Sequence, residues 1–122
     1  MIEGLWKANN VKINQLNYVN GHLNQSDWTL ELHVLSKVNN QYICRIVFHN
    51  NINKHESGHE FLILNYDIND NSIKGEDSNS YFTGYLKNDK IHLISHGFEH
   101  IKNNKNKFIT SYNTTFIKQK NN

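Results

Sequence analysis

The sequence contains no proline and only one cysteine, Cys44. A single cysteine cannot form a disulfide within the chain, so the fold has to rest on packing and hydrogen bonds. Cys44 stands close to Ile43 and Ile46 in the sequence, which is typical of a buried, structural thiol.

Long apolar segments are missing as well. No apolar run approaches the roughly 18 residues that a membrane-spanning helix needs, so we expect no membrane contact. The segment from Met1 to Trp6 has neither the basic region nor the apolar region of a signal peptide. We therefore expect a cytoplasmic protein, located either in the cell that makes it or in the cytosol of a host.

Negative charge is missing near the end of the chain. No acidic residue follows Glu99, whereas five lysines do: Lys102, Lys105, Lys107, Lys118 and Lys120. We interpret them as a solvated strand edge protected by lysines, with contact to phosphates as the alternative. The net charge of +2 is too small to indicate a nucleic-acid partner. Abundant Asn, Lys and Ile without Pro are typical of an AT-rich genome.

What the chain does have is aromatic residues: 2 Trp, 6 Tyr and 6 Phe among 122 residues. Disordered chains are usually poor in such residues, and this length fits one soluble domain spanning residues 1–122. Apolar residues recur with period 2, which predicts strands with one buried face. The clearest runs are Trp28-Leu30-Leu32-Val34, Tyr42-Cys44-Ile46-Phe48 and Phe108-Thr110-Tyr112-Thr114-Phe116.

Turn residues separate these runs. We expect a tight hairpin at Asn20-Gly21, because both central residues of such a turn need positive φ, and further turns at 38–40, 67–71 and 87–89. The predicted strands are 4–13, 27–37, 41–49, 60–66, 72–77, 80–87, 90–98 and 107–118. Together they predict an all-β fold: a single antiparallel up-and-down meander of about eight strands, closed into a barrel because closure removes exposed edges.

The segment Gly4-Leu5-Trp6-Lys7 places a G-x-W motif in the first strand. Together with the later strand-like segments 73–75, 81–86 and 91–94, this motif makes the chain resemble the calycin-type barrels: lipocalins, fatty-acid-binding proteins and avidins. The resemblance implies a barrel that holds a small ligand in its cavity. It also implies that Trp6 closes the end opposite the mouth.

His55-Glu56-Ser57-Gly58-His59 matches H-E-x-x-H, the zincin metallopeptidase motif. On a helix, His55 and His59 would share a zinc ion and Glu56 would act as the general base. Gly58 weakens a helix, and Glu60 places a charge where zincins usually carry an uncharged residue. We therefore expect a polar loop between two strands, with no metal or other cofactor, and keep a small zinc hydrolase as an alternative.

His92, His96 and His100 recur every fourth residue. On a strand, four residues span about 13 Å, which is too far for adjacent members to share one zinc ion. We expect His92 and His96 to face the barrel interior and to line a pocket opposite Trp6, together with aromatic residues. The candidate ligand-binding residues are Trp28, Tyr42, Phe48, Tyr81, His92, His96 and Tyr112.

Three functions compete. The leading one is a non-enzymatic protein that binds a small, partly polar ligand inside the barrel. The first alternative is a protein-interaction module, such as an immunity protein, an inhibitor or an effector of a mobile element or pathogen, that acts by covering a partner. The second is the zinc hydrolase. The sequence does not separate the first two, because a β surface and a β cavity use the same alternation.

Overall fold

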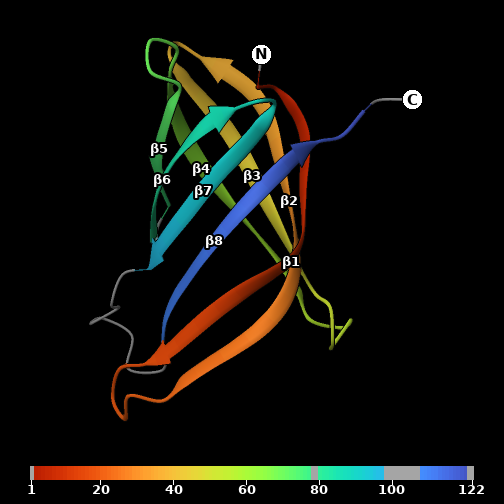
Figure 1. Ribbon diagram of the computed structural model, residues 1–122, viewed down its shortest axis with the longest axis vertical. Helices are drawn as coiled ribbons and strands as arrows, with labels where there is room; N and C mark the ends of the chain where they lie inside the picture. The colour runs from red at the N-terminus through yellow and green to blue at the C-terminus, as the bar shows by residue number, and fades with distance from the viewer. Residues whose placement is uncertain (1, 78–79, 98–107, 121–122) are drawn as a thin grey trace.

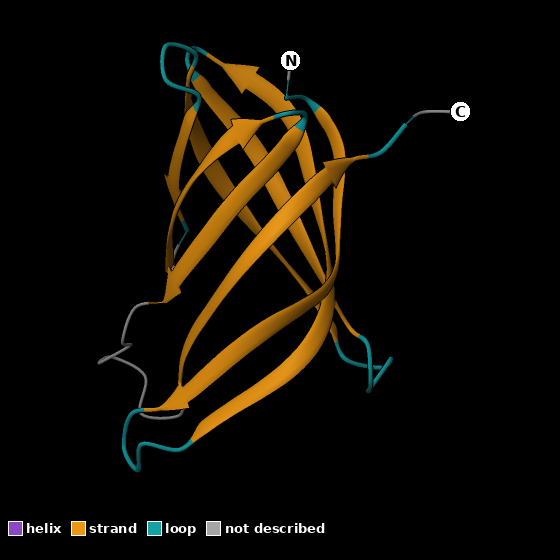
Figure 2. Ribbon diagram, in the orientation of Figure 1, coloured by secondary structure: helices purple, strands orange, loops and turns teal. Residues whose placement is uncertain are grey.

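The computed structural model describes residues 2–77, 80–97 and 108–120. This part of the chain consists of strands and the turns between them (Figures 1 and 2). The eight strands are β1 (Gly4–Asn17), β2 (Leu23–Val38), β3 (Gln41–Asn50), β4 (Ser57–Asp67), β5 (Ser72–Glu76), β6 (Ser80–Lys87), β7 (Lys90–Gly97) and β8 (Phe108–Lys118). Within the described residues no helix is long and apolar enough to cross a membrane.

The strands follow one another around a closed antiparallel barrel, in which β8 pairs with β1. The expected all-β meander of eight strands is therefore confirmed. The boundaries differ by more than one residue in three places: β1 ends at Asn17 rather than 13, β2 begins at Leu23 rather than 27, and β4 begins at Ser57 rather than 60. The expected strand ends at 98 and 107 lie outside the described residues.

The core lies inside the barrel and follows the alternation in the sequence. Leu30, Leu32 and Val34 of β2 are buried, and Cys44 and Ile46 of β3 face them. Cys44 is fully buried, and burial raises the pKa of its thiol to about 12, so the thiol stays protonated and has the structural character that the sequence indicated. Trp6 is also buried, and its indole nitrogen donates a hydrogen bond to the Ile2 carbonyl at 2.9 Å.

The hairpin turn with positive φ at both central residues joins β6 to β7 rather than β1 to β2. Asn88 and Asp89 have φ angles of 54° and 60°, as a two-residue turn with two left-handed positions requires. The expected two-residue turn at Asn20-Gly21 is wrong, because 18–22 form a longer loop in which only Gly21 has positive φ. The side chain of Asn17 organises that loop by accepting hydrogen bonds from the backbone of Val19 and Asn20.

A β-bulge interrupts β1 near its middle. Ala8 pairs with Leu30 and Val11 with Trp28, so Asn9 and Asn10 together oppose Thr29, and Asn10 has a φ of 57°. Such a bulge bends the strand and increases its twist. In Figure 1 the lower halves of β1 and β2 accordingly turn to the lower left, where β1 pairs with the first residues of β8.

Closure of the barrel corrects the interpretation of the C-terminal lysines. The last strand is no edge, because β8 pairs with β7 on one side and β1 on the other. Lys118 ends this strand, and its ammonium nitrogen lies 5.5 Å from the centroid of the Trp6 ring. Lys102, Lys105 and Lys107 lie outside the described residues, as does His100.

Candidate ligand-binding cavity

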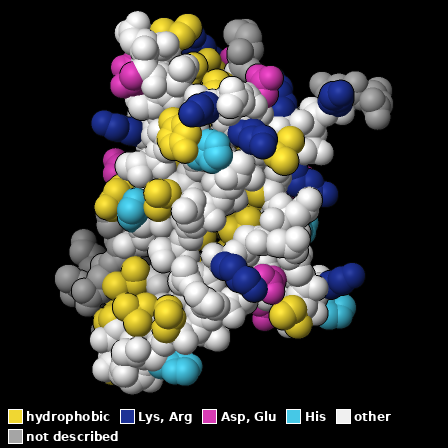
Figure 3. Space-filling model, viewed as in Figure 1, with side chains coloured by type: hydrophobic (Ala, Val, Ile, Leu, Met, Phe, Trp, Pro, Cys, Tyr) yellow, Lys and Arg dark blue, Asp and Glu magenta, His cyan; other side chains and the backbone are white. Residues whose placement is uncertain are grey.

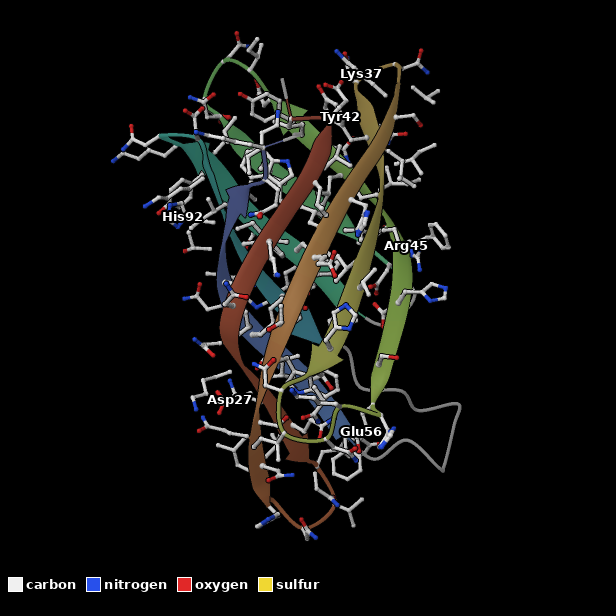
Figure 4. All side chains as sticks on the ribbon, turned by 90° about the vertical axis from the view of Figure 1, so that its right-hand side faces the viewer. Asp27, Lys37, Tyr42, Arg45, Glu56 and His92 are labelled. Carbon is white, nitrogen blue, oxygen red and sulfur yellow. The ribbon has the colours of Figure 1, made fainter. Side chains whose placement is uncertain are left out.

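The barrel is filled near Trp6 and hollow at its other end. Trp6, Phe116 and Ile91 are fully buried close to the chain termini. A cavity of about 480 Å³ lies at the opposite end, toward the β3–β4 loop that carries Glu56 (Figure 4). Ligand sites usually have volumes of roughly 300–1,000 Å³, so this space suits a small molecule.

Three of the seven candidate residues line this cavity: Trp28, Phe48 and Tyr112. Their rings form a connected set, because Trp28 and Phe48 meet edge to face with centroids 6.5 Å apart, and Phe48 and Tyr112 do so at 6.3 Å. The indole nitrogen of Trp28 donates a hydrogen bond to the Ser26 hydroxyl at 2.6 Å, which fixes the indole orientation. The cavity therefore has an aromatic wall held in place by its own contacts.

Tyr42 is buried inside the barrel but does not line the cavity. It lies near the end that holds the β2–β3 turn, whereas Glu56 lies near the opposite end (Figure 4). The Lys37 ammonium nitrogen is 5.8 Å from the centroid of the Tyr42 ring. Burial raises the pKa of the Tyr42 hydroxyl, and the charge of Glu3 raises it further. Tyr42 therefore belongs to the packed end of the core.

Tyr81, His92 and His96 lie on the outer surface of the barrel, and the expectation that they face the interior is wrong. Ile91, Leu93 and Ser95 are the buried residues of β7, so His92 and His96 point outward. On the outer surface the Tyr81 ring stacks on the His96 ring with centroids 4.5 Å apart, and the Tyr85 ring stacks on the His92 ring with centroids 4.7 Å apart. Figure 3 shows histidine side chains beside hydrophobic ones on this face of β6, β7 and β8.

The H-E-x-x-H segment is not helical. His55 and Glu56 belong to the β3–β4 loop, and His59 is an exposed residue of β4, where its ring contacts Phe61. Backbone pairing between His59 and Val47 takes the place of the helical hydrogen bonds that the motif needs. Within the described ranges, no group of three or more His, Cys, Asp or Glu side chains is placed to hold a metal ion. His55 and Glu56 instead line the cavity.

Sequence reasoning missed most of the polar wall. Glu60 follows the inward parity of Leu62 and Leu64 on β4, and Ser95 follows that of Leu93 on β7. A signal for both existed in this parity, but polar residues at inward positions look like solvent-facing ones when hydrophobicity is the guide. The further lining residues are Ile13, Gln15, Ser57, Gly58, Ser80, Phe82, Phe108 and Thr110.

The Tyr112 hydroxyl is the most unusual polar group of the cavity. Tyr112 is only 5% exposed, and its hydroxyl has no hydrogen-bond partner among the described residues. Burial raises the pKa of this hydroxyl far above its usual range, and the charges of Glu60 and Asp77 add to the rise. The nearby Ser95 side chain offsets part of this rise in pKa, although its contact with the Tyr112 hydroxyl does not have hydrogen-bond geometry. The phenol therefore stays neutral and keeps both its proton and its oxygen lone pairs for another partner.

The cavity thus combines rings, hydroxyls and carboxylates at one end of the barrel. This mixture fits a ligand that is partly apolar and partly polar. Comparisons of the chain with protein-family models, with curated proteins and with solved structures found no significant match.

Proposed function

We propose that this barrel binds a small, compact molecule that carries both a ring and a polar group, in the cavity at the end opposite Trp6. The volume of about 480 Å³ supports this proposal, as does the aromatic wall of Trp28, Phe48 and Tyr112. An eight-stranded barrel is just wide enough either to be filled by side chains or to hold one small ligand. The closed meander and the position of Trp6 also support a calycin-like mode of binding.

The observation that carries the proposal is the Tyr112 hydroxyl. A buried polar group without a partner costs about 1–3 kcal/mol, so such groups are uncommon in folded proteins. Here the hydroxyl belongs to a residue that lines a cavity. The hydroxyl is enclosed in the empty protein, so a bound molecule would reach it after a shift of the side chains around it. A polar group of that molecule would then satisfy the hydroxyl, and the adjacent rings would cover its apolar part.

Gly58 offers a direct test, because a side chain can be added there without disturbing the barrel. A Cβ at this position meets no atom within 4 Å, and its φ lies outside the left-handed region. Gly58→Val would therefore extend into the cavity that Gly58 lines. Valine also suits a strand better than glycine does, so the variant should fold as stably as the parent protein.

We expect tyramine or 4-ethylphenol to bind the parent protein with a dissociation constant on the order of 1 mM or tighter, since about ten non-hydrogen atoms can supply roughly 4 kcal/mol. Gly58→Val should weaken this binding at least about tenfold in isothermal titration calorimetry. Asn65→Val, at an exposed position of the same strand, is the matched control and should leave binding unchanged. Failure of both compounds to bind, or equal binding to Gly58→Val, would refute the cavity proposal and favour a protein partner on the outer surface.

A further inference from the structure

The described part of the cavity wall carries acidic side chains and no permanently positive one. Its described lining residues include the carboxylates of Glu56 and Glu60, and neither Lys nor Arg. His55 is the one residue of the described lining whose side chain can become positively charged. Glu56 is exposed and Glu60 is half-buried. Because like charges repel, most strongly where they are partly buried, the described wall disfavours an anionic ligand.

Among the described residues, uncharged partners hold Glu56 in place. Its carboxylate accepts hydrogen bonds from the side-chain amides of Asn50 at 2.9 Å and Asn53 at 3.2 Å, and both donors are uncharged. Asn50 in turn accepts hydrogen bonds from the backbone of Ile52 and Asn53. Hydrogen bonds within the β3–β4 loop thus hold the Glu56 carboxylate at the cavity.

The aromatic wall has the same preference. The faces of aromatic rings carry partial negative charge and attract cations within about 6 Å of the ring centroid. Trp28, Phe48 and Tyr112 meet at interplanar angles of 88° and 77°, so their rings present faces and edges in different directions. A cation in the cavity would be attracted by those ring faces that border it.

We propose that the ligand is an organic cation: a protonated or quaternary amine attached to a compact ring. This inference rests on the proposed binding function and specifies the ligand class of the same cavity. The Tyr112 hydroxyl is enclosed and unpartnered in the empty protein, and it can accept a hydrogen bond from an ammonium group once the side chains around it shift. The rings cover the apolar body of the ligand, and Glu56 balances its charge from the loop.

Three probes that share a phenol ring and a two-carbon arm differ in the charge at the end of the arm: tyramine is a cation, 4-ethylphenol is neutral and 3-(4-hydroxyphenyl)propionate is an anion. Isothermal titration calorimetry at low salt should show tyramine binding at least about tenfold more tightly than 4-ethylphenol, with the anion weakest. Glu56→Gln should reduce the advantage of tyramine several-fold and leave 4-ethylphenol unchanged. Glu76→Gln, an exposed residue of β5, makes the same change in net charge and should alter neither.

The outcomes distinguish the two proposals. Equal binding of tyramine and 4-ethylphenol would overturn the cation inference and leave the binding function standing. Absence of binding by all three probes would overturn both. Thermal melts of each variant would verify folding, and Glu60→Gln provides a second charge-removing substitution in the wall. If tyramine kept its full advantage in Glu56→Gln and in Glu60→Gln, the assignment of selectivity to the carboxylates would be wrong.

Discussion

Tyr112 places a hydroxyl inside the barrel where a phenylalanine would pack without any polar group. A residue chosen for stability alone would not leave a buried hydroxyl without a partner, because the lost hydration is not recovered. Functional sites commonly keep such costs, since the group that destabilises the empty site binds the ligand. This reasoning separates Tyr112 from Tyr66, whose hydroxyl donates a hydrogen bond to Asn71 at 2.6 Å.

Tyr112→Phe should therefore raise the free energy of unfolding of the ligand-free protein by about 1 kcal/mol and weaken tyramine binding several-fold. Tyr66→Phe makes the same chemical change where the hydroxyl is paired, and it should lower stability by about 0.5–1.5 kcal/mol without affecting binding. Urea denaturation and calorimetry would measure both effects. A loss of stability in Tyr112→Phe would mean that the hydroxyl has a partner in the folded protein.

At the scale of strands, the sequence correctly predicted which strands form and in what order. It assigned the wrong face of β7 to the barrel interior. In the middle of β2 the outward residues Thr29, Glu31 and His33 are polar, so the inward side is unambiguous. In β7 both faces carry apolar residues, Ile91 and Leu93 on one side and Ile94 on the other. Period-2 alternation cannot choose between two such faces, and the choice of the wrong one placed His92 and His96 inside the barrel.

The cavity itself was difficult to predict for a related reason. Alternation identifies an inward face only where that face is apolar, but a cavity wall can be polar. Trp28, Phe48 and Tyr112 were identified because rings continue the apolar pattern toward the open end of the barrel. Glu60 and Ser95 break the pattern where the cavity begins, so they looked like surface residues.

The turns show which asparagines have a structural role. Asn39 and Asn88 occupy left-handed positions with φ angles of 59° and 54°, whereas Asn40, beside Asn39 in the same turn, does not have positive φ. A left-handed residue with a Cβ costs roughly 1–2 kcal/mol, and asparagine lowers this cost through local hydrogen bonds. Many asparagines in this chain can reflect coding bias, but these two match a backbone requirement.

Asn39→Ala and Asn88→Ala should each lower the free energy of unfolding by about 1 kcal/mol. Asn40→Ala is the internal control, because it removes the same side chain from an exposed turn position with ordinary φ, and it should change stability by less than about 0.5 kcal/mol. Urea denaturation of the three variants would compare them directly. Equal effects at Asn39 and Asn40 would show that side-chain contacts, rather than backbone conformation, stabilise this turn.

At the scale of the whole barrel, closure removes free edges but does not make every seam equal. The register between β3 and β4 is continuous from Gln41 to His49. Between β1 and β8 it shifts between Lys7 and Asn14. Asn9 and Asn10 lie within that stretch, and they also form the bulge opposite β2. The ladder is therefore irregular on both sides of the same two residues, at the place where β1 bends (Figure 1).

Because local opening begins where backbone pairing is weakest, we expect the barrel to open first at this seam. The amides of Asn9 and Asn10 should exchange with deuterium at least about 100-fold faster than those of Cys44 and Leu62, a difference of roughly 2.7 kcal/mol in local opening free energy. Nuclear magnetic resonance at neutral pH would measure these rates.

The same strand continues into Ile13 and Gln15, which line the cavity, so saturating tyramine should slow exchange along β1 more than along β3. Uniform protection around the barrel would contradict the seam, and unchanged exchange on binding would show that the ligand does not couple to it.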